Sequence, residues 1–513
     1  MEQKFDKLNS DFDTNVKFFE DIFTDCMDVI KREYPPSEAA LPRIYTIYVD
    51  SMADQRFISE HVVQNFILTM RDRDIASTIP VHKKEIYNLL RDIGITSPDI
   101  SETDNMDDLI TFILSGDAVL LIEGNPKGII IASRGFPNRG VQQADTEVVV
   151  QGSKEAFSEV IRFNTCLIRR RIRDTALKVK QSRVGRRTQT DIALMYIEGI
   201  AREQILADVE ARLKNIDIDG ILDSGYIEQL IEDDWKSPFP QCQMTERPDT
   251  AAAAILEGRI VIIVDNSPFV LIVPTTMNTF FQSVEDYSQR FEIMSFTRLL
   301  RFAGGFLAVC LPALYIVIAT HHPAMLPMFL MLNFASASQG VPFPAVGELI
   351  LMDLAFEMLK EAGVRLPGAM GGAIGVVGGL IMGQAAVEAG LVSPIVVIVI
   401  AVTSIAGFAI PHMSLVNGFR LVKYMLIIFA AIAGLFGFWI GMILIIIHLA
   451  SLKSFGIPYL FPFAAGEVTG NKDYLDSFFR PPFFMMKKRP IFADPKEDVR
   501  INMPKVGNTH EKE

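Results

Sequence analysis

The chain has 513 residues, half of them hydrophobic, and carries a formal net charge of −12 at pH 7. The negative charge argues against nucleic-acid binding as the main activity, and the positive mean hydropathy argues against a wholly soluble protein. Most charged residues precede position 300, whereas residues 302–451 contain few, which predicts a soluble region followed by a membrane region.

The soluble region begins with MEQKFDKLNSDFDTNVKFFEDIF, which is acidic and has no apolar signal core. We therefore expect this region to stay in the cytoplasm. The sequence contains no phosphate loop, nucleophile elbow or zinc-ligand spacing, so it predicts no catalytic residue, cofactor or metal, and no enzyme. Four cysteines stand singly, as in a reducing compartment: Cys26, Cys166, Cys242 and Cys310.

Two segments of the soluble region repeat each other. Residues 113–132, ILSGDAVLLIEGNPKGIIIA, align without a gap with residues 255–274, ILEGRIVIIVDNSPFVLIVP. Each has a β-branched apolar run, a short turn with proline and a second apolar run, which predicts a β-hairpin. The soluble region is therefore predicted to be α+β, with two related α/β subdomains at residues 1–134 and 135–290.

Helical spacing and apolar runs predict further elements around the hairpins. Helices are expected over residues 81–94, 153–173 and 203–214, and strands over residues 146–152 and 188–198.

The stretch from Arg169 to Arg187 is the most basic in the chain. It predicts contact with a partner subunit or with anionic lipid, and the alternative is a solvated helix face. The residues named for this contact are Arg169, Arg170, Arg171 and Arg173.

Residues 291–452 are predicted to form a helical transmembrane domain, followed by a cytoplasmic tail over residues 453–513. Arginines before the first span favour a cytoplasmic start. About four full spans are expected, over residues 302–320, 368–389, 393–412 and 424–451.

Residues 324–359 interrupt this pattern with three prolines and with Glu348, Asp353 and Glu357. Such a segment is expected to be broken or re-entrant, because a simple lipid-facing helix would not hold these residues. Four spans return the tail to the cytoplasm, in agreement with its basic residues Lys487, Lys488 and Arg489, but they place Arg420 and Lys423 outside. The alternative, a fifth span over residues 326–350, would place Arg420 and Lys423 inside but the tail outside.

The span at residues 368–389 has two contrasting faces. A small-residue stripe is predicted to pack closely against another helix, and it comprises Gly371, Gly375, Gly379 and Gly383. The opposite face is predicted to line a pore in an oligomer, and it comprises Val377, Ile381, Gln384 and Glu388. The alternative is a tightly packed bundle in which Glu388 only caps the helix near the headgroups.

Six long motifs link the chain to a known family. They are TEVVVQGSKEAFSEVIRFNTCLIRRRI, SPFPQCQMTERPDTAAAAILEGRIVIIVDNSPFVLIVPTTMNTFFQSVEDY, PFPAVGELILMDLAFEMLKEAGVRLP, GQAAVEAGLVSPIVVIVIAVTSIAGFAIP, GIPYLFPFA and RPPFFMMKKRP. Together they resemble the A subunits of the bacterial spore germinant receptors, the spore germination protein A family. The resemblance extends from about residue 50 to about residue 490.

The resemblance implies a multi-pass protein of the spore inner membrane, with its N-terminal domain facing the spore core. It implies a pentameric, ion-conducting subunit that works with a permease-like B subunit and a lipoprotein C subunit. Nutrient binding would open the channel, release ions and trigger germination. A related stage V sporulation protein implies an alternative, an accessory channel without its own nutrient.

Two other classes of function stay open from the residues themselves. A secondary transporter would favour inverted repeats and a break such as that near residues 339–344, but the repeat lies in the soluble region. An enzyme would need convergent reactive groups, and the only candidates are His321 and His322 with Glu348.

Overall fold

The computed structural model describes residues 7–34, 42–64, 87–88, 91, 99–136, 144, 146–365, 378–379, 382–464, 476–497 and 499–501. The chain divides into two compact units. The sheet unit comprises Met1–Glu232, Cys242–Pro274 and Lys487–Glu513, and the helical unit comprises Asp233–Gln241 and Thr275–Met486. These limits differ from the predicted ones, because residues 275–290 and most of the predicted tail belong to the helical unit.

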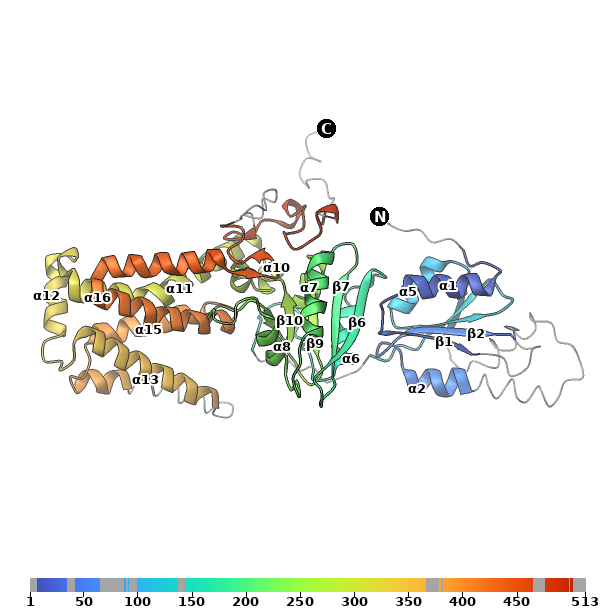
Figure 1. The fold of residues 1–513 in the computed structure, drawn as a ribbon, viewed down its shortest axis with the longest axis horizontal. Coiled ribbons are helices and arrows are strands. Elements are labelled where there is room, and N and C mark those ends of the chain that lie inside the picture. The colour runs from blue at the N-terminus through green and yellow to red at the C-terminus, as the bar shows by residue number, and fades with distance from the viewer. Residues whose placement is uncertain are drawn as a thin grey trace, which may run out of the picture. The chain divides into compact units, whose positions relative to one another are not determined.

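The first sheet of the sheet unit has the strand order β1-β2-β4-β5-β3, with every neighbouring pair antiparallel (Figure 1). Its strands are β1 Val29–Tyr34, β2 Ile44–Val49, β3 Ile100–Thr103, β4 Ala118–Ile122 and β5 Gly128–Ile131. One face packs on two amphipathic helices, α1 Phe12–Ile22 and α5 Met106–Leu114. The other face packs on the helical turn formed by α2 Gln55–Phe57 and the π-helix Ile58–Gln64.

The second sheet repeats this topology in the order β6-β7-β9-β10-β8, again antiparallel throughout. Its strands are β6 Leu177–Val184, β7 Thr190–Ile197, β8 Gln243–Thr245, β9 Ile260–Val264 and β10 Val270–Val273. Its helices are α6 Ile161–Arg169, α7 Glu203–Lys214, α8 Ser224–Ile231 and α9 Pro248–Leu256. The predicted hairpins are confirmed as β4–β5 and β9–β10, at equivalent places in two sheets with the same strand order.

Two other predictions for the sheet unit are wrong. Residues 153–173 do not form one helix, because the backbone N–H of Phe157 bonds the Glu246 carbonyl and α6 begins only at Ile161. Residues 146–152 do not form a strand, since a Glu246 carboxylate oxygen accepts the N–H groups of residues 146 and 147.

The predicted helix at 203–214 is confirmed as α7, and the strand at 188–198 is confirmed as β7. Most of the predicted helix at 81–94 lies outside the described residues.

The stability of the sheet unit is expected to depend on pH through Glu147. Burial raises the pKa of its carboxyl to about 7, and the nearby Glu246 carboxylate adds to this, although Thr245 donates a hydrogen bond of 2.5 Å to Glu147. A carboxyl group in an unfolded chain has a pKa of about 4.3. The folded state therefore holds the proton more tightly, so this contribution to stability is present below about pH 4 and is lost as the pH rises to about 7.

Glu147→Gln is therefore expected to stabilise the sheet unit at pH 8 by up to about 3 kcal/mol and to leave its stability at pH 4 nearly unchanged. Hydrogen exchange of the β8 amides in the full chain, followed by mass spectrometry at both pH values, measures the difference. Equal exchange of variant and wild type at pH 8 would contradict the prediction.

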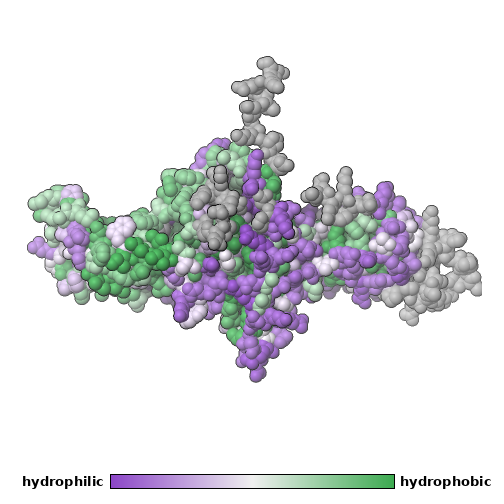
Figure 2. Space-filling view, turned by 45° about the horizontal axis from the view of Figure 1, so that its top comes forward, coloured by the Kyte–Doolittle hydropathy of each residue, from purple (hydrophilic) through white to green (hydrophobic). Residues whose placement is uncertain are grey.

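The helical unit is built from long apolar helices. They are α11 Phe291–Ile316, α12 Met328–Ala337, α13 Ala345–Arg365, α15 Pro394–Phe408 and α16 Met413–Ser451, with a short α10 Glu285–Ser288 before them. Among the residues that the structure describes, two stretches are long and apolar enough to cross a membrane: Phe291–His321 and Met413–Ser451. Figure 2 shows hydrophobic residues gathered over the outside of this unit. Those with high exposure include Phe306, Ile405, Leu421 and Ile432. The interruption predicted within 324–359 is confirmed between α12 and α13.

Helix α16 is a hairpin of two antiparallel arms, so the prediction of a single span at 424–451 is wrong. The helical backbone stops at Ala433 and Gly434, where Gly434 adopts a positive φ of 58°. A Cβ on Gly441 would lie 2.7 Å from Leu426, and one on Gly437 would meet the carbonyl oxygen of Phe429. Glycines therefore let the two arms approach at backbone distance, as small residues do between membrane helices.

An inserted segment, Asp233–Gln241, joins the helical unit although α8 and β8 of the sheet unit flank it. The ring of Phe239 lies 6.2 Å from that of Phe419 and 6.0 Å from that of His448, on the two arms of α16. Ser237 Oγ lies 2.9 Å from His448 Nε2. This segment therefore packs across the open end of the hairpin.

Candidate functional site: charged side chains among the apolar helices

A buried ion pair joins α13 to the first arm of α16. Lys423 Nζ lies 2.6 and 2.8 Å from the two carboxylate oxygens of Asp353, and both side chains are 5 % exposed. Burying a single unpaired charge among apolar helices costs several kcal/mol, which explains why the two groups are paired. The pair fixes the relative position of the two helices.

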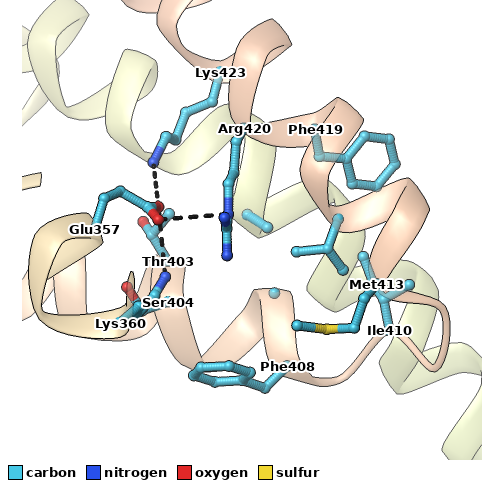
Figure 3. A pocket seen from close by; sticks show the side chains of 13 residues that line it. Glu357, Lys360, Thr403, Ser404, Phe408, Ile410, Met413, Phe419, Arg420 and Lys423 are labelled. Carbon is cyan, nitrogen blue, oxygen red and sulfur yellow. Dashed lines mark ion pairs between the residues drawn. The ribbon is translucent and has the colours of Figure 1, made fainter. Parts of the chain in front are cut away.

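The carboxylate of Glu357 forms further ion pairs beside this one, so the charged side chains form a cluster (Figure 3). The Glu357 oxygens lie 3.5 Å from Arg420 Nε, 3.5 Å from Lys360 Nζ and 3.9 Å from Lys423 Nζ. Three cations thus share the two carboxylates of Asp353 and Glu357, so the cluster has a formal charge of +1.

Local geometry explains how the sequence builds this ion-pair cluster. Asp353 and Glu357 are four residues apart on α13, and Arg420 and Lys423 are three apart on α16. Residues at these spacings lie on one face of a helix, so each helix presents two charged groups to the other. The charges therefore meet inside the helical unit.

A pocket opens beside the ion-pair cluster (Figure 3). Lys360, Arg420 and Lys423 line it with Glu357 as the one carboxylate, and the Arg420 Nε atom is buried with no hydrogen bond in the described part of the chain. Glu357 is its ion-pair partner at 3.5 Å, but a buried donor without a hydrogen bond is costly, which favours water or a small anion at this place. No group of three or more potential metal ligands occurs among the described residues.

Two of the arginines before the first predicted span, Arg298 and Arg301, are held by carboxylates. Arg298 is fully buried, with Asp286 at 3.0 Å and Asp476 at 2.8 Å, and Arg301 lies 2.7 Å from Asp286. These pairs tie α10 and the segment after residue 475 to the start of α11. The first turns of α11 therefore belong to a fixed polar layer.

In the described part of the predicted pore helix, the glycines face neighbouring helices and the polar side chains are exposed. In the helical residues 382–388, Gly383 is buried and faces Val397 of α15, whereas Gln384 and Glu388 are exposed and joined by a hydrogen bond of 2.8 Å. Gly379 faces Phe356 and Leu359 of α13. The other predicted residues lie outside the described part: Gly371, Gly375, Val377 and Ile381.

The predicted partner contact needs a correction at Arg169. Its guanidinium is fully buried and bonds both oxygens of Asp28 at 2.7 and 2.9 Å, as well as the Leu177 carbonyl at 2.9 Å. A side chain without exposed area reaches neither lipid nor a partner, so Arg169 instead joins the first subdomain to the second. Arg170 and Arg171 share Glu155, and only Arg173 is classed as exposed, so a contact through these three stays a prediction.

Two of the three candidate residues for an enzyme, Glu348 and His321, contact parts of the helical unit in ways that suit a structural role. Glu348 is buried and accepts a hydrogen bond of 2.9 Å from the N–H of Ser393, at the start of α15, where a carboxylate is favoured. His321 lies against Gly434 at the turn of the α16 hairpin.

The ion-pair cluster was not predicted from the sequence, although its members were visible there. In the sequence, Asp353 and Glu357 indicate a broken helix, and Arg420 and Lys423 are charges that four spans would place outside. The signal was the matched spacing of opposite charges in two apolar helices, which indicates pairing inside the membrane rather than loops.

Comparison with known proteins gives the family. Residues 17–492 match the family described as Bacillus/Clostridium GerA spore germination protein. Spore germination protein KA of Bacillus subtilis is 40 % identical over 92 % of this chain and 85 % of its own length. The uncharacterized membrane protein YfkQ of the same organism is 39 % identical over 91 % of this chain and 88 % of its own length.

A crystal structure of the N-terminal domain of the A subunit of the Bacillus megaterium spore germinant receptor GerK3 matches at 32 % identity and a TM-score of 0.40. It covers 52 % of this chain and 96 % of that domain. The family match and the curated relatives confirm the resemblance drawn from the motifs, and this chain belongs to the GerA family of spore germination proteins.

Proposed function

We propose that this chain is the A subunit of a nutrient-responsive spore germination receptor and that several copies form a gated ion channel in the spore inner membrane. The family and the names of the relatives support the receptor assignment. The subunit acts by conducting ions rather than by catalysing a reaction. A pentamer, a permease-like B subunit and a lipoprotein C subunit complete the proposal, by resemblance to the family.

One observation carries the channel part of the proposal. Within the helical residues 382–388, Gly383 is buried against Val397 of the same chain, whereas Gln384 and Glu388 are exposed. The other exposed residues of the helical unit are largely apolar. A carboxylate directed at lipid costs a few kcal/mol, so this stripe needs water or a neighbouring subunit beside it. An aqueous path shared between copies satisfies that need, and its carboxylates would favour cations.

The path of the chain supports a multi-pass topology with an even number of crossings. Because the chain leaves the sheet unit after Pro274 and re-enters it at Lys487, we expect both flanks of the helical unit on one side of the membrane. We place that side in the cytoplasm, which becomes the spore core. Arg420 and Lys423 lie within a helix and are paired, so they do not contradict this orientation.

The alternative within the same family is an accessory channel without its own nutrient, which the resemblance to a stage V sporulation protein implies. Deleting the chain distinguishes the two functions. A receptor subunit is required for the response to its own nutrient, whereas loss of an accessory channel slows germination with every nutrient.

Cysteine labelling tests the pore. The four native cysteines are buried, so introduced thiols report with low background. In the assembled complex, Gln384→Cys and Glu388→Cys are expected to react with a charged, membrane-impermeant reagent, and the modification should alter ion release. Leu421→Cys is the control, because Leu421 is 65 % exposed on an apolar face of α16 and should lie in lipid, where it stays unlabelled.

Protection of residues 384 and 388, or modification without any effect on ion release, would contradict a pore at this helix. The receptor assignment would survive that result, because it is tested separately by the deletion.

A further inference from the structure

Strand β6 is an edge of the second sheet, and part of its outer edge is already used by another segment. Residues 25–27 run beside it, with Cys26 paired to Val179 in parallel orientation. The N–H of Met27 donates to the Val179 carbonyl at 3.1 Å, and the N–H of Val179 donates to the Asp25 carbonyl at 2.9 Å. The edge is therefore able to accept an added strand.

The next part of the same edge is open. Backbone groups alternate in direction along a strand, so those of Gln181 and Arg183 point outward as those of Val179 do. Neither N–H finds a backbone acceptor on that side within the described part of the chain. The side chains of residues 181–183 are exposed, and Met27, where the added segment ends, is 63 % exposed. Unpaired edges of this kind are sites for strand addition.

A groove of about 630 Å³ runs along this open edge. Its floor contains the apolar side chains of Leu194, Leu213 and Ile216. The volume is within the range of ligand sites, roughly 300–1,000 Å³, and suits the side chains on one face of an extended segment.

Basic side chains outnumber acidic ones in the lining of the groove. Lys180, Arg183, Arg186 and Lys214 line it, against Asp25 and Glu210. Lys180 already pairs with both of these acids, at 3.7 and 2.9 Å. Arg183 and Arg186 are 67 % and 64 % exposed. Arg183 pairs with Asp191, and Arg186 pairs with Asp217 and Asp219, but these are surface ion pairs, which contribute little and exchange readily.

We propose that the edge at Gln181–Arg183 binds an extended acidic segment of a partner protein by strand addition. Backbone hydrogen bonds to residues 181 and 183 hold the segment, its carboxylates meet Arg183, Arg186 and Lys214, and its inward apolar side chains occupy the groove. The added strand continues the line that residues 25–27 begin. Binding at this edge does not require that the chain form a channel.

The binding test uses the full chain in detergent and a fluorescent peptide of alternating glutamate and valine, with alternating lysine and valine as the reference. Anisotropy is expected to show binding of the acidic peptide only. Gln181→Pro removes one outward N–H, which an edge strand tolerates, and should weaken binding about tenfold. Gln181→Ala keeps that N–H and should bind like wild type. Arg183→Glu combined with Lys214→Glu should abolish binding.

Equal binding of the two peptides, or binding that neither Gln181→Pro nor the double charge reversal weakens, would overturn the proposal. A photo-crosslinking residue at position 182 in the full receptor identifies the natural occupant. The proposal expects an adduct with an acidic segment of another protein, lost in Gln181→Pro and kept in Gln181→Ala. An adduct with a second copy of this chain would overturn it.

Discussion

Asp353→Ala is expected to destabilise the helical unit by about 3–5 kcal/mol, since it removes one member of a buried ion pair. Lys423 would keep its charge at 5 % exposure, with Glu357 at 3.9 Å as its nearest remaining carboxylate. The expected result is a lower thermal transition and faster proteolysis of the full chain in detergent, and spores that do not respond to nutrient.

The control variants separate pairing from packing. Asp353→Leu with Lys423→Met removes both charges and fills the space, so it should recover most of the stability that Asp353→Ala loses. Exchanging the two charges, as Asp353→Lys with Lys423→Asp, should restore part of it. If Asp353→Ala were as stable as wild type, or if the apolar pair were no better than the single variant, the buried pair would not hold these helices together.

The sequence predicted those parts of the fold whose signals are local. The hairpins β4–β5 and β9–β10 were predictable because apolar β-branched runs meet at a turn, and α7 because its apolar residues recur at helical spacing. The start of α6 was not predictable. The side chain of Asn164 forms hydrogen bonds with both the N–H and the carbonyl of Ser158. A carboxylate oxygen of Asp265 accepts the N–H of Ile161 at 3.0 Å, so a partner 104 residues away decides where the helix begins.

The same distinction applies to the candidate site. The small-residue stripe stays a prediction, because the structure describes only Gly379 and Gly383 of its four glycines, and these two pack against α13 and α15. The burial of Arg169 was not predictable, since its partner Asp28 is 141 residues away and the surrounding basic residues suggested a surface. The hairpin of α16 was also hidden, because residues 424–451 are apolar without interruption and Gly434 looks like any other glycine in the helix.

Gly418→Ala is expected to detach the inserted segment, Asp233–Gln241, from the α16 hairpin. A Cβ at this position would lie 2.5 Å from the carbonyl oxygen of Pro238, and a backbone atom cannot move aside as a side chain can. Overpacking of this kind costs about 1–3 kcal/mol, which exceeds the gain of about 1 kcal/mol from replacing glycine by alanine in a helix. The contact between Ser237 and His448 should be lost with it.

Gly407→Ala is the matched control, because Gly407 is also a buried helical glycine but its added Cβ would make only an ordinary contact of 3.8 Å with Val416. Hydrogen exchange in the full chain should show faster exchange of Asp233–Gln241 in Gly418→Ala and unchanged exchange in Gly407→Ala. The inserted segment lies between α8 and β8 in the chain and packs across both arms of the hairpin. Spores with Gly418→Ala should therefore also germinate more slowly. Equal exchange in the two variants would show that the segment does not depend on close approach to α16.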